Sequence, residues 1–202
     1  MAELREEGFQ KSENIKKLSP AWELETDVSI LKLSMLDPFL KKEIQNILSS
    51  LTSKGWKPKI FYGFRSRKEQ LEIVKRGHSK TKYSNHNVVI GNEKNPIPNS
   101  LAVDIIDKRY AWVFKQDKAA DFFKALGAEA GYSYKDGKWI QTKDTGLMWG
   151  GSWSKNKLWR PYNLGWDPAH IELKSKSNLW TENEKLYGTN FPEDYHLYPK
   201  PK

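Results

Sequence analysis

A carboxylate inside an apolar run constrains this chain more than any other feature. Residues Leu101 to Ile106 have the composition of a buried strand, and Asp104 stands between Val103 and Ile105. Burying a lone carboxylate is costly, so the group has to be paired with a cation, protonated or bound to a metal. Asp104 therefore has to hold a proton, form a structural salt bridge with one of the 34 basic residues, or bind a metal ion.

A second polar cluster lies between Gly165 and Leu173. It contains His170, one of only four histidines, with Asp167 before it and Glu172 after it. The alternation of polar and apolar residues from position 170 onwards is typical of a strand, in which His170 and Glu172 share a face. A histidine with an acid held beside it suits a metal ligand with a general base. Polar surface decoration is the alternative.

His86 is the third candidate ligand, although its loop of Ser, Asn and Lys would also suit a solvent-exposed histidine. The chain has no cysteine, which excludes thiolate sites and leaves His, Asp and Glu to bind any metal. His86, Asp104 and His170 would together form a three-ligand site with an open fourth position. That layout is typical of catalytic zinc, which activates water as a nucleophile near neutral pH.

Two further charged residues would complete such a site. Asp167, by its position, would take the proton of the attacking water and later deliver it to the leaving amine. Arg65, at the end of its strand, could hold a developing oxyanion or a substrate carboxylate. A surface salt bridge is the alternative for Arg65.

The composition predicts one folded domain with terminal extensions. The chain has 202 residues and a mean hydropathy of −0.78, but nine Trp, nine Tyr and eight Phe can fill a core. We expect an N-terminal arm or added subdomain at 1–30, a catalytic domain at 31–173 and a C-terminal tail at 174–202. No apolar run reaches about 18 residues, so we expect no membrane span. The charged N-terminus does not resemble a signal peptide.

The net charge of +9 indicates attraction to a polyanion, with plain solubility as the alternative. Lysines are scattered evenly and form no basic block, so we expect no nucleic-acid partner.

Hydrophobic periodicity and turn residues predict the order of the elements. We expect helices at 34–53, 67–76 (capped by Ser66) and 110–130, strands at 59–62, 101–106 and 170–173, short strands or turns at 139–140 and 147–149, and a loop at 78–98. We expect Trp149 and Trp166 in the core.

Four groups of motifs lie in order between residues 34 and 173. They are Leu36 to Gln70 with Tyr62-Gly63-Phe64-Arg65-Ser66, then Ser84-Asn85-His86 with Ala102-Val103-Asp104, then Leu147 to Trp153, and last Asp167 to Glu172. This order resembles that of the peptidoglycan-cleaving zinc peptidases related to D-alanyl-D-alanine carboxypeptidases. The last two groups resemble one branch in particular, the L-alanyl-D-glutamate endopeptidases, which include phage endolysins and bacterial cell-wall hydrolases.

The resemblance implies one zinc ion on His86, Asp104 and His170, with Asp167 as catalytic acid and base and Arg65 as electrostatic stabiliser. The dipeptidase and carboxypeptidase branches commonly have Glu where Asp167 stands, so the Asp favours the endopeptidase branch. The resemblance also implies an α+β fold, with a small antiparallel sheet carrying the zinc site and helices packed on one side.

One departure from the family pattern lies between two of the ligands. The usual motif is Ser-x-His-x-x-Gly-x-Ala-x-Asp, but here Asp104 stands 18 positions after His86, and Ser100 takes the place of the Gly. The insertion at 87–99 contains Pro96 and Pro98, which indicate a stiff segment. It could cover the cleft as a lid, contact glycan, or form a plain surface bulge.

The sequence therefore predicts a zinc peptidase that cuts the peptidoglycan stem peptide between L-alanine and D-glutamate. A D-alanyl-D-alanine carboxypeptidase or dipeptidase is one alternative, and a cell-wall-binding module with a vestigial site is another. Ser84 and Trp153 are candidate substrate-binding residues. Glu172 is either a support for a liganding histidine or part of a plain strand salt bridge.

The resemblance also places the protein in its surroundings. We expect a monomer that acts in the periplasm or cell wall, either phage-encoded and released at lysis or a processed secreted form. The tail and the net charge could tether it to anionic wall polymers.

Overall fold

The structure is a computed structural model that describes residues 29–79, 82–92, 95–110, 117–153 and 159–174. The chain divides into two units, Met1–Leu31 and Lys32–Lys202, and the labelled elements described below belong to the second. The expected arm at 1–30 and tail at 174–202 lie outside the described residues, apart from residues 29, 30 and 174.

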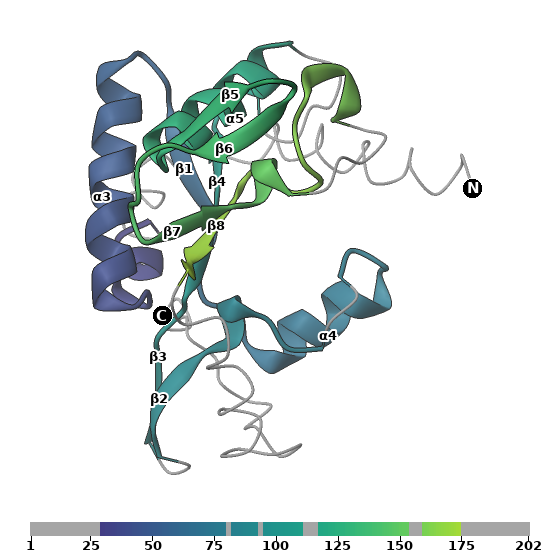
Figure 1. Cartoon of the computed structure of the whole chain (residues 1–202). Helices are drawn as coiled ribbons and strands as arrows, with labels where there is room; N and C mark the ends of the chain where they lie inside the picture. Colours follow the sequence, from purple (N-terminus) through teal and green to yellow (C-terminus); the bar gives the residue numbers. More distant parts are fainter. Residues whose placement is uncertain (1–28, 80–81, 93–94, 111–116, 154–158, 175–202) are drawn as a thin grey trace. The chain divides into compact units, whose positions relative to one another are not determined.

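A four-stranded antiparallel sheet forms the centre of this unit (Figure 1). Its strands stand in the order β1 (Pro58–Tyr62), β4 (Ala102–Asp107), β8 (His170–Leu173) and β7 (Leu147–Trp149). The strands expected at 59–62, 101–106 and 170–173 are thus confirmed within one residue at each end. Because β4 and β8 are neighbours, residues far apart in the sequence meet in the middle of the sheet.

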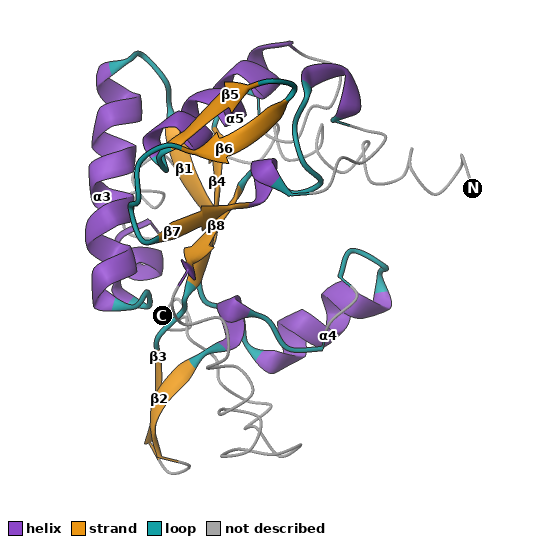
Figure 2. Cartoon of the chain, in the orientation of Figure 1, coloured by secondary structure: helices purple, strands orange, loops and turns teal. Residues whose placement is uncertain are grey.

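Helices α3 (Pro38–Ser53) and α5 (Asp117–Glu129) contact each other and the strands β1 and β4 (Figure 2). Their buried residues join those of the strands in one hydrophobic core, which includes Leu40, Ile44, Phe122, Phe123 and Leu126. The other elements include helix α4 (Arg67–Lys75), the hairpins β2 (Val89–Asn92) to β3 (Asn95–Pro98) and β5 (Tyr132–Lys135) to β6 (Lys138–Gln141), and the short turns η1 (Asn85–Asn87), η2 (Gly150–Ser152) and η3 (Arg160–Tyr162). Residues 29–34 are also helical. The expected α+β class is confirmed.

The register of the sheet separates an apolar face from a polar one. Val103 lies opposite Ile171 and both are fully buried, whereas Asp104 lies opposite His170. Side chains alternate between faces along a strand, so Val103 and Ile171 face the core while Asp104 and His170 share the other face. The sheet thus presents two candidate ligands side by side on its polar face.

Helix α3 begins at Pro38, four residues later than expected. Asp37 caps it, because its side chain accepts a hydrogen bond from the Phe39 backbone N–H at 3.0 Å, and proline favours the first helical position. Leu36, which continues the apolar periodicity, lies before this helix and forms an isolated β-bridge with Ser100.

The loop expected at 78–98 is wrong over its second half, which forms the β2–β3 hairpin. Val89 is buried whereas the next residue, Ile90, is 49% exposed, as expected for alternating faces of a strand. Ile90 pairs with Ile97, which is 55% exposed, so the hairpin presents an apolar pair to solvent.

Trp149 is fully buried, which confirms its expected place in the core. The same expectation for Trp166 is wrong, since this residue is 49% exposed and its ring lies 5.2 Å from that of Trp153. Among the described residues, no helix has the length and apolar character that a membrane crossing requires.

Candidate metal centre

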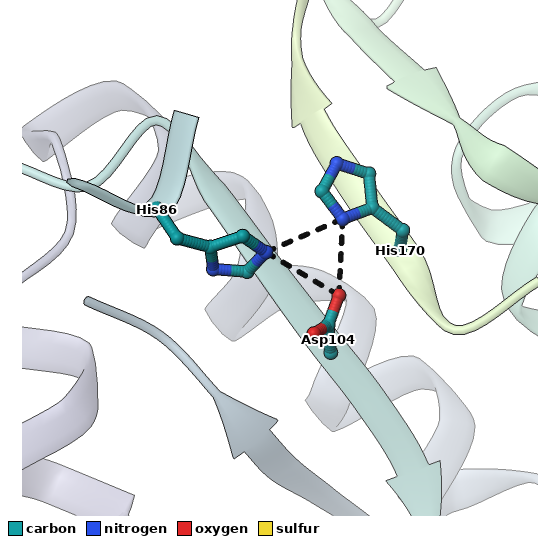
Figure 3. Close-up of side chains that lie close together, drawn as sticks. All are labelled: His86, Asp104 and His170. Atoms are coloured by element: carbon teal, nitrogen blue, oxygen red, sulfur yellow. Dashed lines mark hydrogen bonds and ion pairs between the residues drawn. The ribbon is translucent and has the colours of Figure 1, made fainter. Parts of the chain in front are cut away.

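Three buried side chains converge on the polar face of the sheet (Figure 3). His86 Nε2 lies 3.3 Å from His170 Nδ1 and 3.5 Å from Asp104 Oδ1, and His170 Nδ1 lies 3.0 Å from the same oxygen. The three residues are 1%, 4% and 7% exposed for His86, Asp104 and His170. Two imidazole nitrogens and one carboxylate oxygen around one point form a donor set that can hold a metal ion.

The inserted segment does not separate the ligands, because its two ends are tied together. The Leu101 N–H donates to the Asn85 carbonyl at 2.8 Å, and the Asn99 N–H donates to the Val88 carbonyl at 2.9 Å. Both ties lie at the base of the β2–β3 hairpin, which extends beyond the second one. The turn that carries His86 is thereby fixed against the start of β4, the strand that carries Asp104.

Ser84 caps the η1 turn and so orients His86. Its hydroxyl oxygen accepts from the His86 backbone N–H at 3.3 Å, and its own backbone N–H donates to Asn87 Oδ1 at 2.9 Å. In the structure Ser84 thus positions the turn that carries His86. Its role in substrate binding stays a prediction.

Each histidine has its second ring nitrogen held by an acceptor. His86 Nδ1 donates to the Gly63 carbonyl at 2.6 Å, which leaves Nε2 to face the other two residues. His170 Nε2 donates to Glu172 Oε2 at 3.1 Å, and the same oxygen accepts from Asn85 Nδ2 at 2.8 Å. Hydrogen bonds of this kind orient liganding histidines in metal proteins.

Arg65 divides the two oxygens of Asp104 between different partners. Its Nη2 donates to Asp104 Oδ2 at 2.6 Å, so that Oδ1 faces the histidines. The guanidinium is held by Gln70 Oε1 at 3.2 Å from Nη1 and lies over the Tyr62 ring at 4.6 Å. The salt bridge of Arg65 is therefore not on the surface, because its partner is the buried candidate ligand Asp104.

The charges of the centre depend strongly on one another. Burial raises the pKa of Asp104, but the charge of His86, hydrogen bonds from both histidines and Arg65 outweigh it and hold that pKa well below 3.8. Burial lowers the pKa of His86. Burial also acts to lower the pKa of His170, but hydrogen bonds to Asp104 and Glu172 outweigh it and raise that pKa to about 10. A metal ion would have to displace the proton on His170 Nδ1, so binding would release a proton.

Asp167 stands three residues before His170, in the loop that leads into β8, and is half-buried. Burial, followed by the negative charge of Asp104, raises the pKa of the Asp167 carboxyl to about 6, while His170 and Arg65 oppose the rise. Its carbonyl accepts from the His170 N–H at 3.1 Å. A Cβ added at Gly150 would stand 2.2 Å from that same oxygen, so the Gly-Gly turn is needed for this close approach.

Trp153 forms the wall next to His170, since their ring centroids lie 5.2 Å apart. The structure thus brings the side chains of Arg65, Glu172 and Trp153 to the candidate ligands. It links Asp167 to His170 through a backbone hydrogen bond.

Sequence reasoning missed two groups that hold the centre, the Gly63 carbonyl and the Asn85 amide. A backbone carbonyl carries no sequence signal. The only hint for Asn85 was its place beside His86 in the Ser-Asn-His motif.

Comparisons with known proteins identify no family, since no protein-family model and no curated protein matches the chain. The functional argument therefore depends on the residues and geometry of the centre.

Proposed function

We propose that the protein is a zinc-dependent peptidase that hydrolyses the stem peptide of bacterial peptidoglycan between L-alanine and D-glutamate. The observation that carries the proposal is the buried His86, Asp104 and His170 group, whose facing atoms are 3.0 to 3.5 Å apart. The choice of substrate is supported by the order of motifs in the sequence, which resembles that of the L-alanyl-D-glutamate endopeptidases.

The spacing of the three donor atoms suits zinc. In a tetrahedral site with zinc–ligand distances of about 2.0–2.1 Å, neighbouring ligand atoms are roughly 3.3–3.4 Å apart. Two histidines and one carboxylate leave a fourth position open, as in catalytic zinc sites. When bound, zinc supplies a Lewis acid that polarises the scissile carbonyl and activates water.

Asp167 has the properties of the general base in this proposal. A carboxyl whose pKa lies at about 6 can accept a proton from water and return it to the leaving amine near neutral pH. Its backbone carbonyl accepts from the His170 N–H at 3.1 Å, and the charges of Asp104, His170 and Arg65 act on the pKa of its carboxyl.

Arg65 would have two parts in the reaction. Its Nη2 holds the liganding carboxylate of Asp104 in place. Its positive charge, next to the three ligands, would stabilise negative charge that develops on the substrate oxygen.

The test is mass spectrometry of the fragments that the protein releases from purified sacculi, with and without a zinc chelator. New amino termini at D-glutamate that the chelator abolishes would support both the bond and the metal. Release of D-alanine alone would overturn the endopeptidase assignment in favour of a carboxypeptidase. No release, together with no bound zinc in the purified protein, would instead indicate a binding module. His170→Ala serves as the matched inactive control.

A further inference from the structure

A pocket of about 200 Å³ lies beside the metal centre, and Trp153 belongs to both. The Trp153 ring lines the pocket, and its centroid lies 5.2 Å from that of the His170 ring. Pockets that enclose a whole small ligand measure roughly 300–1,000 Å³. A smaller pocket next to the ligands therefore suits one residue of a longer substrate.

Three segments of the fold build this pocket, and hydrogen bonds fix them to one another. Trp139 Nε1 on β6 donates to the Asn163 carbonyl at 2.8 Å, and the Gly165 N–H donates to the Gly151 carbonyl at 2.7 Å. The side chains that line the pocket are Lys138, Trp139, Ser152, Trp153 and Asn163. The walls are thus preformed by the β5–β6 hairpin, the turn after β7 and the loop before β8.

Among the described residues that line the pocket, Lys138 is the one that carries a charge. It is exposed, and the ion pairs of the described residues include no acidic partner for it. The Trp139 indole N–H and the Ser152 hydroxyl already donate to the carbonyls of Asn163 and Trp149. The described lining therefore combines one lysine with two aromatic residues, Trp139 and Trp153, a composition that suits a short aliphatic group ending in a carboxylate.

We propose that this pocket binds the free carboxylate of the substrate residue next to the cleaved bond, with Lys138 as its cation. The inference rests on the proposed function, because the D-glutamyl residue of a stem peptide has a second carboxyl group that is either free or amidated. Lys138 would then let the protein distinguish these two forms of peptidoglycan.

The test compares two synthetic peptides, L-alanyl-γ-D-glutamyl-L-lysine with a free carboxylate on its D-glutamyl residue and the same peptide with a carboxamide there. For the zinc-loaded full chain we expect KM to be about 3–10-fold lower for the carboxylate peptide, as for a partly shielded ion pair. Lys138→Met should remove this difference by raising KM for the carboxylate peptide alone, with little change in kcat.

Lys135→Met is the matched control. Lys135 pairs with Lys138 across the hairpin and is exposed, so its loss changes the net charge equally without removing a residue that lines the pocket. Equal effects of the two substitutions would overturn the proposal, because only the overall charge of the protein would then matter.

Binding to the metal-free protein separates this proposal from the proposed function. The two dissociation constants can be followed by tryptophan fluorescence, since Trp139 and Trp153 line the pocket. A Lys138-dependent preference in binding, with cleavage of neither peptide, would support the pocket and overturn the proposed function. Cleavage of both peptides without any preference would overturn the pocket and leave the proposed function standing.

Discussion

Glu172 decides which nitrogen of His170 faces the other two candidate ligands. Its carboxylate is held by Asn85 at 2.8 Å and in turn accepts from His170 Nε2 at 3.1 Å. Because burial alone would raise the pKa of Glu172, and the hydrogen bond and charge of His170 hold it low, the carboxylate remains ionised beside the histidine. The sequence left open whether Glu172 supports a liganding histidine or forms a plain strand salt bridge. In the structure it holds the candidate ligand His170.

We expect Glu172→Ala to weaken zinc binding about 10–100-fold, the usual effect of losing a carboxylate that orients a liganding histidine. Competition with a chromophoric chelator measures the dissociation constant. Met148→Leu is the control, because Met148 lies opposite Glu172 in the sheet on β7. Unchanged zinc affinity in Glu172→Ala would return Glu172 to the role of a strand salt bridge.

Substitutions of Asp167 and His170 should separate zinc binding from catalysis. We expect Asp167→Ala to keep zinc but to lose about 10²–10⁴-fold in kcat, the usual contribution of a general base. His170→Ala should lose both zinc and turnover, because it removes a donor atom. Metal analysis together with kinetics on a stem peptide measures the two effects. Near-normal turnover in Asp167→Ala would make Glu172 the candidate base.

The same carboxyl should set the acid limb of the pH profile. Below its pKa of about 6, Asp167 is protonated and cannot accept a proton, so kcat/KM should fall as the pH drops. A bound cation lowers the pKa of a nearby carboxyl, so the midpoint in the zinc enzyme should lie at or below about 6. An acid limb with a midpoint near 8 would contradict the assignment.

Among the secondary-structure elements, α5 approaches Trp149 of β7 at a glycine, Gly127. A Cβ added at Gly127 would stand 2.4 Å from the ring of Trp149, which is fully buried. Alanine normally stabilises a helix interior relative to glycine by roughly 0.5–1 kcal/mol. Here the overlap with a buried ring should outweigh that gain.

We therefore expect Gly127→Ala to lower the free energy of unfolding by about 1–3 kcal/mol, the usual cost of overfilling a core. Urea denaturation measures it. Lys124→Ala is the control, since Lys124 lies on the same helix with a partly exposed side chain and a weak ion pair to Asp121. A more stable Gly127→Ala protein would mean that α5 does not approach β7 this closely.

Elements whose periodicity is strong could be predicted from the sequence, and those that depend on tertiary contacts could not. The buried residues of α3 repeat at three and four residue steps, and Ser66 caps α4 through a capping box. The β2–β3 hairpin lacked such a signal, because its strands are four residues long and β3 contains two prolines. Trp166 was misplaced because an aromatic residue next to a site suits either a core or an exposed wall.

The candidate ligands could be named from residue types, but their arrangement could not. Asp104 was informative because an acid in a buried strand needs a partner. The Asn85 amide and the Gly63 carbonyl act through contacts that only the folded chain creates, 87 and 23 positions along the sequence from their partners.

At the scale of the whole molecule, a metal ion at the centre would join parts of the chain that are distant in sequence. His86 and His170 are 84 positions apart, and Asp104 lies between them on a different strand. An ion that binds these three residues only when they are together stabilises the folded state against the unfolded one.

Zinc should therefore raise the unfolding temperature of the full chain. At a free zinc concentration 1,000 times the dissociation constant, the gain is about 4 kcal/mol, or about 8–16 °C in Tm for a domain of this size. Thermal denaturation with zinc and with chelator measures the shift. In His170→Ala the shift should disappear, because the remaining two donors bind zinc far more weakly. Equal Tm values for the wild-type protein in zinc and in chelator would mean that the folded state holds no metal at His86, Asp104 and His170, and the proposed chemistry would have no cofactor.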